Sequence, residues 1–290
     1  MNLCLFFEGT GQGVAGNFTN VTRLYAASAE SEWQRLFLES GPGTHFGAYI
    51  RGALHGHDWW IVFRRARRWF EKNHNLYPPV SELRVFLFGF SRGALIARHF
   101  AAWLDKINVE VAYLGLWDTV DATLGLDVDE EAPGNVRFVR HAVARDEMRK
   151  LYAYIPIRKR LSDGEGAGIS RAQKVEELVF PGSHSDVGGL FDDNHDIADV
   201  ALSWIAEGAV DCGLLLKDEA LLNPKIDSSK TVLHDSHGEA TNLWGALGRI
   251  KRKLGKLREH ALCSILQPCD EKDSEKNKEE KHGEESEKKY

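Results

Sequence analysis

The chain has 290 residues, of which 43% are hydrophobic, and a formal net charge of −6 at pH 7. This length is enough for one substantial α/β domain or two small ones, and the hydrophobic content is ordinary for a soluble protein. The negative charge argues against nucleic acid as the main partner, and no apolar run approaches the length needed to cross a bilayer.

The amino terminus, MNLCLFF, lacks the basic region of a signal peptide, so we expect a first strand there and synthesis in the cytoplasm. The four cysteines have no Cys-x-x-Cys spacing, which predicts reduced thiols.

Strand patterns and helix patterns alternate along the first two thirds of the chain. Strands are predicted over residues 3–7, 35–39, 83–88 and 175–180 and in the segment that ends at 118; helices are predicted over 20–32, 58–73 and 197–209 and from about 94. No core element is predicted between 121 and 168. The alternation predicts a single α/β domain over 1–243, with a mostly parallel sheet and helices on both faces.

The stretch LRVFLFGFSRGALIARHF places a serine in a sharp turn between a strand and a helix. Gly89-Phe90-Ser91-Arg92-Gly93 has the Gly-x-Ser-x-Gly pattern of a nucleophile elbow, which exposes a serine hydroxyl at the end of a strand. Gly89 and Gly93 are needed because side chains there would collide with the strand and the helix around the turn. The pattern predicts Ser91 as a nucleophile, with the helix N-terminus behind it.

Two later segments provide an acid and a base in the order Ser, Asp, His that α/β-hydrolases have. The strand in VEVAYLGLWDTV ends at Asp118, and the strand in KVEELVFPGSHSDVGGL leads into a loop with His184. Because the carboxyl ends of parallel strands meet at one edge of a sheet, both side chains are expected beside Ser91. The alternatives are a capping role for Asp118 and a hydrogen-bonded loop role for His184. Asp186 is a competing acid, which we expect to fix its own loop.

The first loop, GTGQGVAG, has two possible roles. Backbone N–H groups of Gly9 and Thr10 are expected to join that of Arg92 in an oxyanion hole. The same loop has the Gly-x-Gly-x-x-Gly spacing of a dinucleotide-binding unit. Its helix-start signal, Thr19-Asn20, comes too late for these glycines to place a pyrophosphate at a helix N-terminus, which favours the first role.

Three polar segments have the residue types of metal ligands at close spacing: HGHD at 55–58, DDNHD at 192–196 and HDSH at 234–237. None has a recognised zinc spacing, so we predict neither a catalytic metal nor a cofactor.

The motifs GFSRGA, GLWDTV and FPGSHSDVGG together resemble the catalytic domain of the type VI secretion lipase effectors, an α/β-hydrolase family. The segment LCLFFEGTGQGVAGNFTNVTRLY resembles the opening strand, turn and helix start of that family, and RLFLESGPGT and LHDSH resemble later segments, so that the resemblance covers about residues 3–237. It places Ser91, Asp118 and His184 on the positions of the family's catalytic triad. Glu8 stands where the family usually has aspartate.

The resemblance implies an A-type phospholipase that cleaves acyl esters of membrane phospholipids. It also implies export by type VI secretion without a signal peptide, with a secretion spike and an immunity protein as partners. The larger effectors have an additional carboxyl-terminal region for membrane contact, which this chain is too short to include. The alternatives are a soluble carboxylesterase and a non-catalytic module that binds a nucleotide or a partner on the same scaffold.

Beyond the predicted domain, the segment WGALGRIKRKLGKLREHAL at 244–262 places apolar and basic residues at helical spacing. Such a basic amphipathic helix is typical of contact with an anionic membrane surface. The alternative is a last helix that packs on the domain and leaves its basic face in solvent. Its apolar face would consist of Trp244, Leu247, Ile250, Leu254 and Leu257, and its basic residues are Arg249, Lys251, Arg252, Lys253, Lys256 and Arg258. Residues 270–290 are almost entirely polar and charged and are expected to form a disordered tail.

Overall fold

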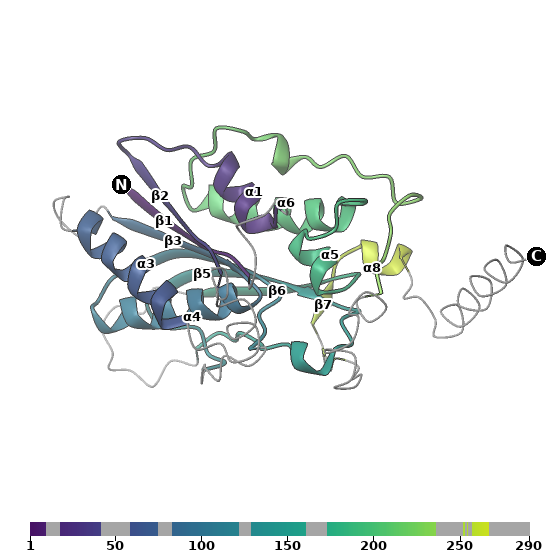
Figure 1. Ribbon diagram of the computed structural model, residues 1–290, viewed down its shortest axis with the longest axis horizontal. Coiled ribbons are helices and arrows are strands. Elements are labelled where there is room, and N and C mark those ends of the chain that lie inside the picture. Colours follow the sequence, from purple (N-terminus) through teal and green to yellow (C-terminus); the bar gives the residue numbers. More distant parts are fainter. Residues whose placement is uncertain are drawn as a thin grey trace, which may run out of the picture.

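A parallel β-sheet runs through the protein (Figure 1). The computed structural model describes residues 1–9, 18–41, 59–74, 83–121, 129–160, 173–235, 252, 254 and 257–266. Within these residues the sheet has seven strands in the order β2-β1-β3-β4-β5-β6-β7, each parallel to its neighbours. The strands are β1 (Asn2–Phe7), β2 (Gln34–Glu39), β3 (Arg84–Phe90), β4 (Val111–Trp117), β5 (Val136–Ala144), β6 (Lys174–Phe180) and β7 (Arg258–Glu259).

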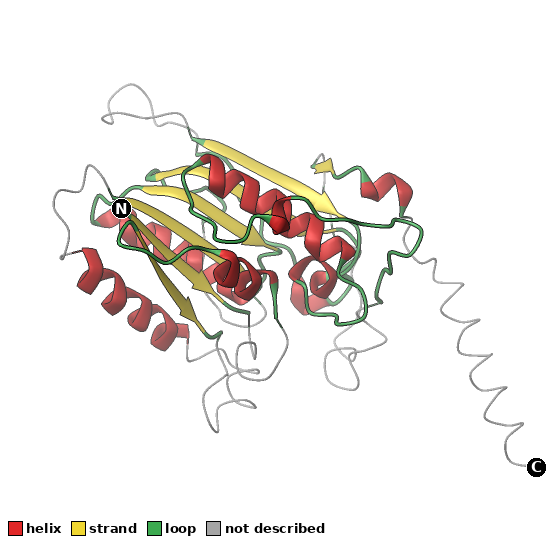
Figure 2. Cartoon of the chain, turned by 90° about the horizontal axis from the view of Figure 1, so that it is seen from above, coloured by secondary structure: helices red, strands yellow, loops and turns green. Residues whose placement is uncertain are grey.

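Helices cover both faces of the sheet, as the alternating pattern predicted (Figures 1 and 2). α3 (Trp59–His74) and α4 (Arg92–Lys106) pack on one face around Phe70, Phe100 and their neighbours. α1 (Asn20–Ala27) and α6 (Asp196–Asp211) pack on the other face around Phe88 and Trp117. The shorter helices are α5 (His184–Gly188), α8 (Leu262–Ile265) and the 3₁₀ turns η2 (Lys150–Tyr152) and η3 (Ala220–Leu222). Among the described residues, no helix is both long enough and apolar enough to span a membrane.

α1 begins where its sequence signal lies. The Thr19 hydroxyl accepts the backbone N–H groups of Val21 and Thr22, which have no partner within the helix, and so caps it. The helix ends at Ala27, five residues before the predicted end, where the Ser28 hydroxyl and backbone N–H both bond back to the Leu24 carbonyl.

β5 is a strand of the central sheet within the stretch where no core element was predicted. Its sequence, VRFVRHAVA, is buried at most positions without an alternation of apolar and polar residues, and it includes three charged or titratable side chains. Each of these has an acidic partner on a neighbouring strand or turn: Arg137 with Glu110, Arg140 with Glu176 and His141 with Glu177. The pairing lets a strand with basic residues lie inside a sheet, which a hydrophobic pattern does not reveal.

The prediction of one basic helix over 244–262 is wrong in the part that the structure describes. Arg258 and Glu259 form β7, which pairs with β6, and the chain becomes helical only at Leu262. Leu254 and Leu257 pack against the buried cluster of Val143, Val179 and Cys263. Backbone pairing at the open edge of β6 together with this packing overrides the helical pattern. Trp244, Leu247 and Ile250 lie outside the described residues, as does the predicted tail at 270–290.

Because β7 and α8 are part of the folded core, we expect a chain that ends at residue 243 to be less stable. It loses the edge strand, buried Leu262 and Cys263, and the guanidinium of Arg252, which is 3% exposed. Asp118, the ionic partner of that guanidinium, would be left buried without a counter-charge. This lowers the free energy of unfolding by about 3–5 kcal/mol, so the midpoint of thermal unfolding should fall by roughly 10 °C. A chain that ends at 268 is the matched control and should keep the midpoint of the full chain. Equal midpoints for all three chains would contradict this account.

Candidate active site

The order of the strands fixes where a site can form. β1 connects through α1 to β2 on one side, whereas β3 connects through α4 to β4 on the other side and over the opposite face. The point between β1 and β3 is therefore a topological switch point, outside which the carboxyl ends of open α/β sheets form a crevice. Gly9 follows β1 at this edge and Ser91 follows β3.

Ser91 sits in a strained turn at the carboxyl end of β3. Its backbone has φ 58° and ψ −127°, a region that residues with a side chain rarely adopt, and its N–H donates to the Trp117 carbonyl (3.0 Å). A side chain at Gly93 would lie 2.2 Å from the Phe7 carbonyl oxygen, and one at Gly89 would lie 2.6 Å from the Ala94 Cα. The two glycines thus allow the strand and α4 to meet closely enough to form the turn.

Asp118 follows β4, the neighbour of β3, and is completely buried. Its backbone also has a positive φ, 40°, and its N–H donates to the Ala142 carbonyl (2.7 Å). The carboxylate accepts the backbone N–H of Ala144 (2.9 Å) and lies 2.6 Å from Nδ1 of His184. The acid and the histidine, 66 residues apart in the sequence, are therefore in direct contact.

His184 is the first residue of α5, immediately after the turn that follows β6. Its ring is stacked on that of Phe90 (4.5 Å between ring centroids) and contacts that of Tyr152 edge-on (4.9 Å). Its backbone N–H donates to Glu147 (3.2 Å). Burial lowers the pKa of His184, and the hydrogen bond with Asp118 raises it by less, so the imidazole is biased toward its neutral form. Because Phe90 precedes Ser91, this stacking brings the imidazole to the edge where the serine lies.

Arg252 also contacts Asp118, which the sequence pattern does not reveal. Its guanidinium binds both carboxylate oxygens (2.6 and 2.9 Å) and donates to the carbonyls of Ala144 and Tyr152 (3.0 and 2.6 Å). Burial raises the pKa of Asp118, but the charge of Arg252 and the hydrogen bond with His184 outweigh it and hold the pKa well below its usual range. The sequence pattern counted Arg252 among six basic residues of a predicted surface helix and could not distinguish it from the other five.

Three residues were predicted to form an oxyanion hole. Arg92 begins α4 directly after Ser91, and Gly9 lies against the elbow, since a side chain there would be 3.4 Å from the Ser91 Cβ. Thr10 lies outside the described residues.

Glu8, which stands where the resembled family has aspartate, is buried at the end of β1. It accepts hydrogen bonds from the hydroxyls of Thr19 and Thr22. Burial raises its pKa despite these hydrogen bonds. The carboxyl group thus ties the start of α1 to the end of β1.

The competing acid, Asp186, lies in α5, and it fixes its own segment, as predicted. Its carboxylate accepts the backbone N–H of Ser183 (2.7 Å) in a capping box of α5 and pairs with Nδ1 of His234 (2.5 Å). His234 also lies 3.1 Å from both carboxylate oxygens of Asp193 and stacks on Phe191. His234 and its two acids therefore support the helix that carries His184. Within the described part of the chain, which excludes residues 55–58 and His237, no group of three or more His, Cys, Asp or Glu side chains has an arrangement that could hold a metal ion.

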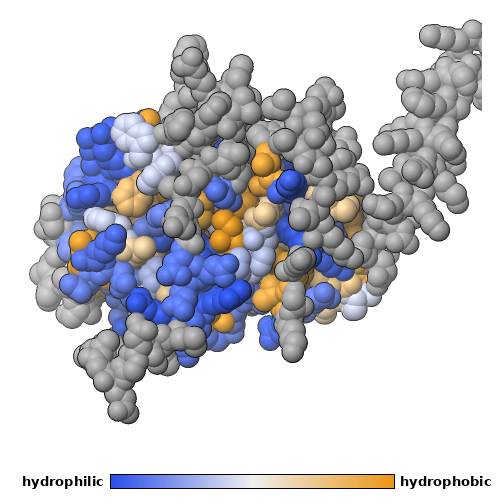
Figure 3. All heavy atoms as spheres, turned by 90° about the horizontal axis from the view of Figure 1, so that it is seen from below, coloured by the Kyte–Doolittle hydropathy of each residue, from blue (hydrophilic) through white to orange (hydrophobic). Residues whose placement is uncertain are grey.

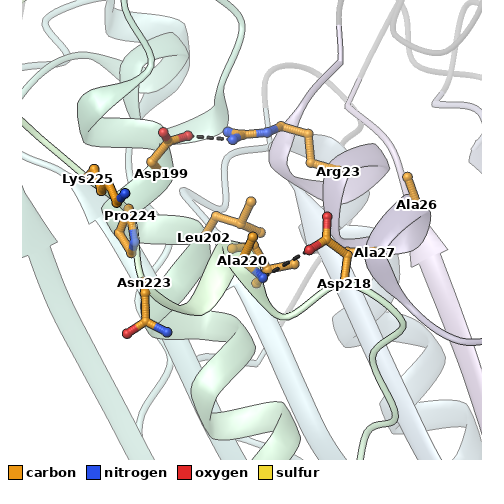
Figure 4. A pocket seen from close by; sticks show the side chains of 11 residues that line it. Arg23, Ala26, Ala27, Asp199, Leu202, Asp218, Ala220, Asn223, Pro224 and Lys225 are labelled. Carbon is orange, nitrogen blue, oxygen red and sulfur yellow. Dashed lines mark hydrogen bonds and ion pairs between the residues drawn. The ribbon is translucent and has the colours of Figure 1, made fainter.

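A separate hollow of about 590 Å³ lies between α1, α6 and η3 (Figure 4). Arg23 of α1 and Asp199 of α6 form an ion pair across it (2.5 Å), and Asp218 and Lys225 add further charges. It shares no residue with the Ser91 site. The glycines of the predicted dinucleotide loop lie outside the described residues.

A serine elbow at the switch point of a parallel sheet, followed in sequence by an acid and a histidine that meet at the same edge, defines the α/β-hydrolase fold. Residues 1–109 and 102–208 match the family described as "T6SS, Phospholipase effector Tle1-like, catalytic domain". The chain belongs to this family.

Two solved structures match this chain over about half of their own length. An uncharacterized protein from Pseudomonas aeruginosa is 21% identical, with a TM-score of 0.52, and the match covers 76% of this chain and 47% of that protein. The Tle1 effector, solved bound to the VgrG spike of the type 6 secretion system, is 20% identical, with a TM-score of 0.48, and the match covers 66% and 51%. The chain thus spans about half the length of these two proteins.

A third structure belongs to the RedJ thioesterase from the prodiginine pathway of Streptomyces coelicolor. It is 13% identical, with a TM-score of 0.41, and the match covers 71% of this chain and 86% of that one. No curated protein matches the chain.

The different surroundings of the two acids predict different costs when each is replaced by asparagine. Asp118→Asn leaves the buried guanidinium of Arg252 without its counter-charge and should lower the free energy of unfolding at pH 7 by about 3–5 kcal/mol. Asp186→Asn should cost only about 1–2 kcal/mol, because burial already raises the pKa of Asp186 and so disfavours its charged form. Urea unfolding measures both values.

The pH dependence gives a check on the same pair. The folded-state pKa of Asp118 is lowered, so its contribution to stability is present above about pH 4 and is lost as the pH falls through the folded value. The difference between wild type and Asp118→Asn should therefore shrink on acidification. If Asp186→Asn lowers the free energy of unfolding at pH 7 by more than Asp118→Asn does, then Asp118 is not the acid that depends on a buried ion pair.

Proposed function

We propose that the protein is a serine ester hydrolase that cleaves acyl esters of phospholipids, with Ser91 as nucleophile, His184 as general base and Asp118 as the acid that orients the base. The observation that carries this proposal is the 2.6 Å contact between Asp118 and Nδ1 of His184, at the sheet edge where the strained turn presents Ser91. Family membership supports the choice of a phospholipid substrate.

The hydrogen bond with Asp118 keeps the proton on Nδ1 of His184, so that Nε2 is the acceptor for the Ser91 hydroxyl. Ser91 Oγ attacks the acyl carbonyl while its proton passes to Nε2, and the imidazolium then protonates the leaving alcohol of the lysophospholipid. Water, deprotonated by His184, releases the fatty acid from the acyl-enzyme. Burial lowers the pKa of His184, which favours the neutral base needed for the first step.

The developing oxyanion needs hydrogen-bond donors that are already in place. We assign this role to the backbone N–H groups of Arg92, Gly9 and Thr10. Arg92 belongs to the elbow and begins the fifteen-residue helix α4, and Gly9 lies against the Ser91 side chain. The positive end of the α4 dipole adds to their effect.

The exposed face of α3 is suited to a lipid surface. Glu39, at the end of β2, forms an ion pair with Arg65 in the second turn of α3 (3.0 Å). The helix therefore begins at the catalytic edge of the sheet. Its exposed residues are one tryptophan and five basic side chains: Trp60, Arg64, Arg65, Arg67, Arg68 and Lys72. The guanidinium of Arg64 lies over the Trp60 ring, 4.7 Å from its centroid. α3 lies on the left in Figure 1, the side on which hydrophilic colours predominate in Figure 3.

A tryptophan and arginines on one helix face match the boundary between acyl chains and anionic headgroups. We assign to α3 the membrane contact that the sequence pattern predicted for residues 244–262. Export by type VI secretion, a spike partner and an immunity protein belong to the same proposal, supported by the family and by the Tle1 effector's complex with a VgrG spike.

Ser91→Ala should abolish hydrolysis of a soluble short-chain ester and leave thermal unfolding unchanged. Loss of a triad nucleophile costs on the order of a million-fold in turnover. The measurement is release of the chromogenic alcohol, with Ser183→Ala, which removes a hydroxyl that caps α5, as the control that keeps Ser91. More than about 1% of wild-type turnover in Ser91→Ala would show that Ser91 is not the nucleophile. An inactive wild-type protein that still binds a partner would favour the non-catalytic module.

The double variant Arg64→Glu/Arg68→Glu should lose binding to vesicles that contain anionic phospholipid and keep its activity on the soluble ester. Each basic side chain near such a surface contributes about 1 kcal/mol, so vesicle affinity should fall by roughly 30-fold or more. Lys217→Glu/Lys225→Glu makes the same change in net charge beside η3 and should bind vesicles normally. Equal vesicle binding by both double variants would exclude α3 as the lipid contact, and hydrolysis of the soluble ester alone would favour a carboxylesterase.

A further inference from the structure

The contact between Arg252 and Asp118 is unusual because it puts a second cation on an acid that already faces a histidine. The carboxylate has four partners: Oδ1 accepts the Ala144 N–H and one guanidinium nitrogen, whereas Oδ2 lies against the other guanidinium nitrogen and His184. The Arg252 side chain is 3% exposed and that of Asp118 is 0% exposed. A buried two-point ion pair of this kind fixes both the direction and the charge of the carboxylate.

The segment that carries Arg252 is anchored independently of that ion pair. β7 pairs with β6, and the His260 N–H donates to the Val179 carbonyl (2.8 Å). Arg145 donates to the carbonyls of Cys263 and Leu266 (2.9 and 2.8 Å) and pairs with its neighbour Asp146. The guanidinium therefore reaches Asp118 from a segment that the sheet edge holds in place.

On the basis of the proposed function, we propose that Arg252 is a positioning residue that fixes the Asp118 carboxylate toward His184 and offsets its charge, so that His184 stays neutral at lower pH. An uncompensated carboxylate stabilises the imidazolium beside it and makes the histidine a stronger base. The guanidinium shares that carboxylate and weakens the effect. The active site is then completed by a residue far along the chain from all three members of the triad.

Two other charged groups near His184 act on its pKa in opposite directions, since the charge of Arg149 lowers it and that of Glu147 raises it. Glu147 accepts the His184 backbone N–H and is paired with Arg149 (2.8 Å), so these two charges largely cancel. Arg149 lies over the Tyr152 ring, which contacts the imidazole. On α5 itself, Asp186 is paired with His234 and bonded to Ser183.

The test is the pH profile of kcat/KM on a soluble ester, whose acid limb reports the pKa of His184 in the free enzyme. Arg252→Met should move this limb to higher pH by roughly one pH unit, so that the rate at a pH below the limb falls roughly tenfold relative to the pH optimum. Arg252→Lys keeps the charge but loses the two-point contact; its limb should stay near the wild-type position, and its kcat should fall several-fold because the carboxylate is held less firmly.

Arg145→Met is the matched control, because it loosens the same segment without a contact to Asp118. It should lower the thermal midpoint and leave the acid limb in place. If Arg252→Met loses activity with no movement of the limb, the residue is only structural and the inference is wrong. If Arg252→Met does not fold, unchanged kcat in Arg252→Lys overturns the positioning role. Failure of the wild-type enzyme to hydrolyse any ester would instead refute the proposed function itself.

Discussion

A charge buried at the end of the central sheet is the constraint on which the rest of the site depends. Asp118 has no contact with solvent, and an isolated carboxylate in such surroundings would take up a proton. The protein keeps it charged with a guanidinium, an imidazole and a backbone N–H, drawn from the carboxyl-terminal segment, α5 and β5. Elements that are distant in the sequence are thereby tied to one point.

This arrangement also explains why the carboxyl-terminal segment cannot be regarded as an appendage. Its pairing with β6 is only two residues long, which is little for a strand that stands alone. The ion pair with Asp118 and the packing of Cys263 against Val143 and Val179 provide further stabilisation of this segment. Stability and chemistry therefore depend on the same contact, and removing the segment affects both.

The strands and helices that frame the elbow could be predicted because each depends on a local pattern. The turn around Ser91 is specified by its glycines, and Asp118 and His184 stand at strand ends, where parallel topology brings side chains together. β5 was missed because its three basic or titratable side chains find acids on other elements. Arg252 was assigned to a helix face because its sequence neighbours are basic too, and only the pairing of β7 with β6 reveals that it turns inward. The structure of β5 and the position of Arg252 both depend on partners that are distant in the sequence, and a single sequence does not show such partners.

The assignment of Ser91, His184 and Asp118 as one catalytic unit is tested most directly by the site of covalent modification. A fluorophosphonate reacts with a serine only where a base activates the hydroxyl, and digestion followed by mass spectrometry locates the adduct. Our account predicts a single adduct on the peptide that contains Ser91 and a labelling rate at neutral pH that falls by orders of magnitude in His184→Ala. An adduct on another serine, or undiminished labelling of Ser91 without His184, would contradict it.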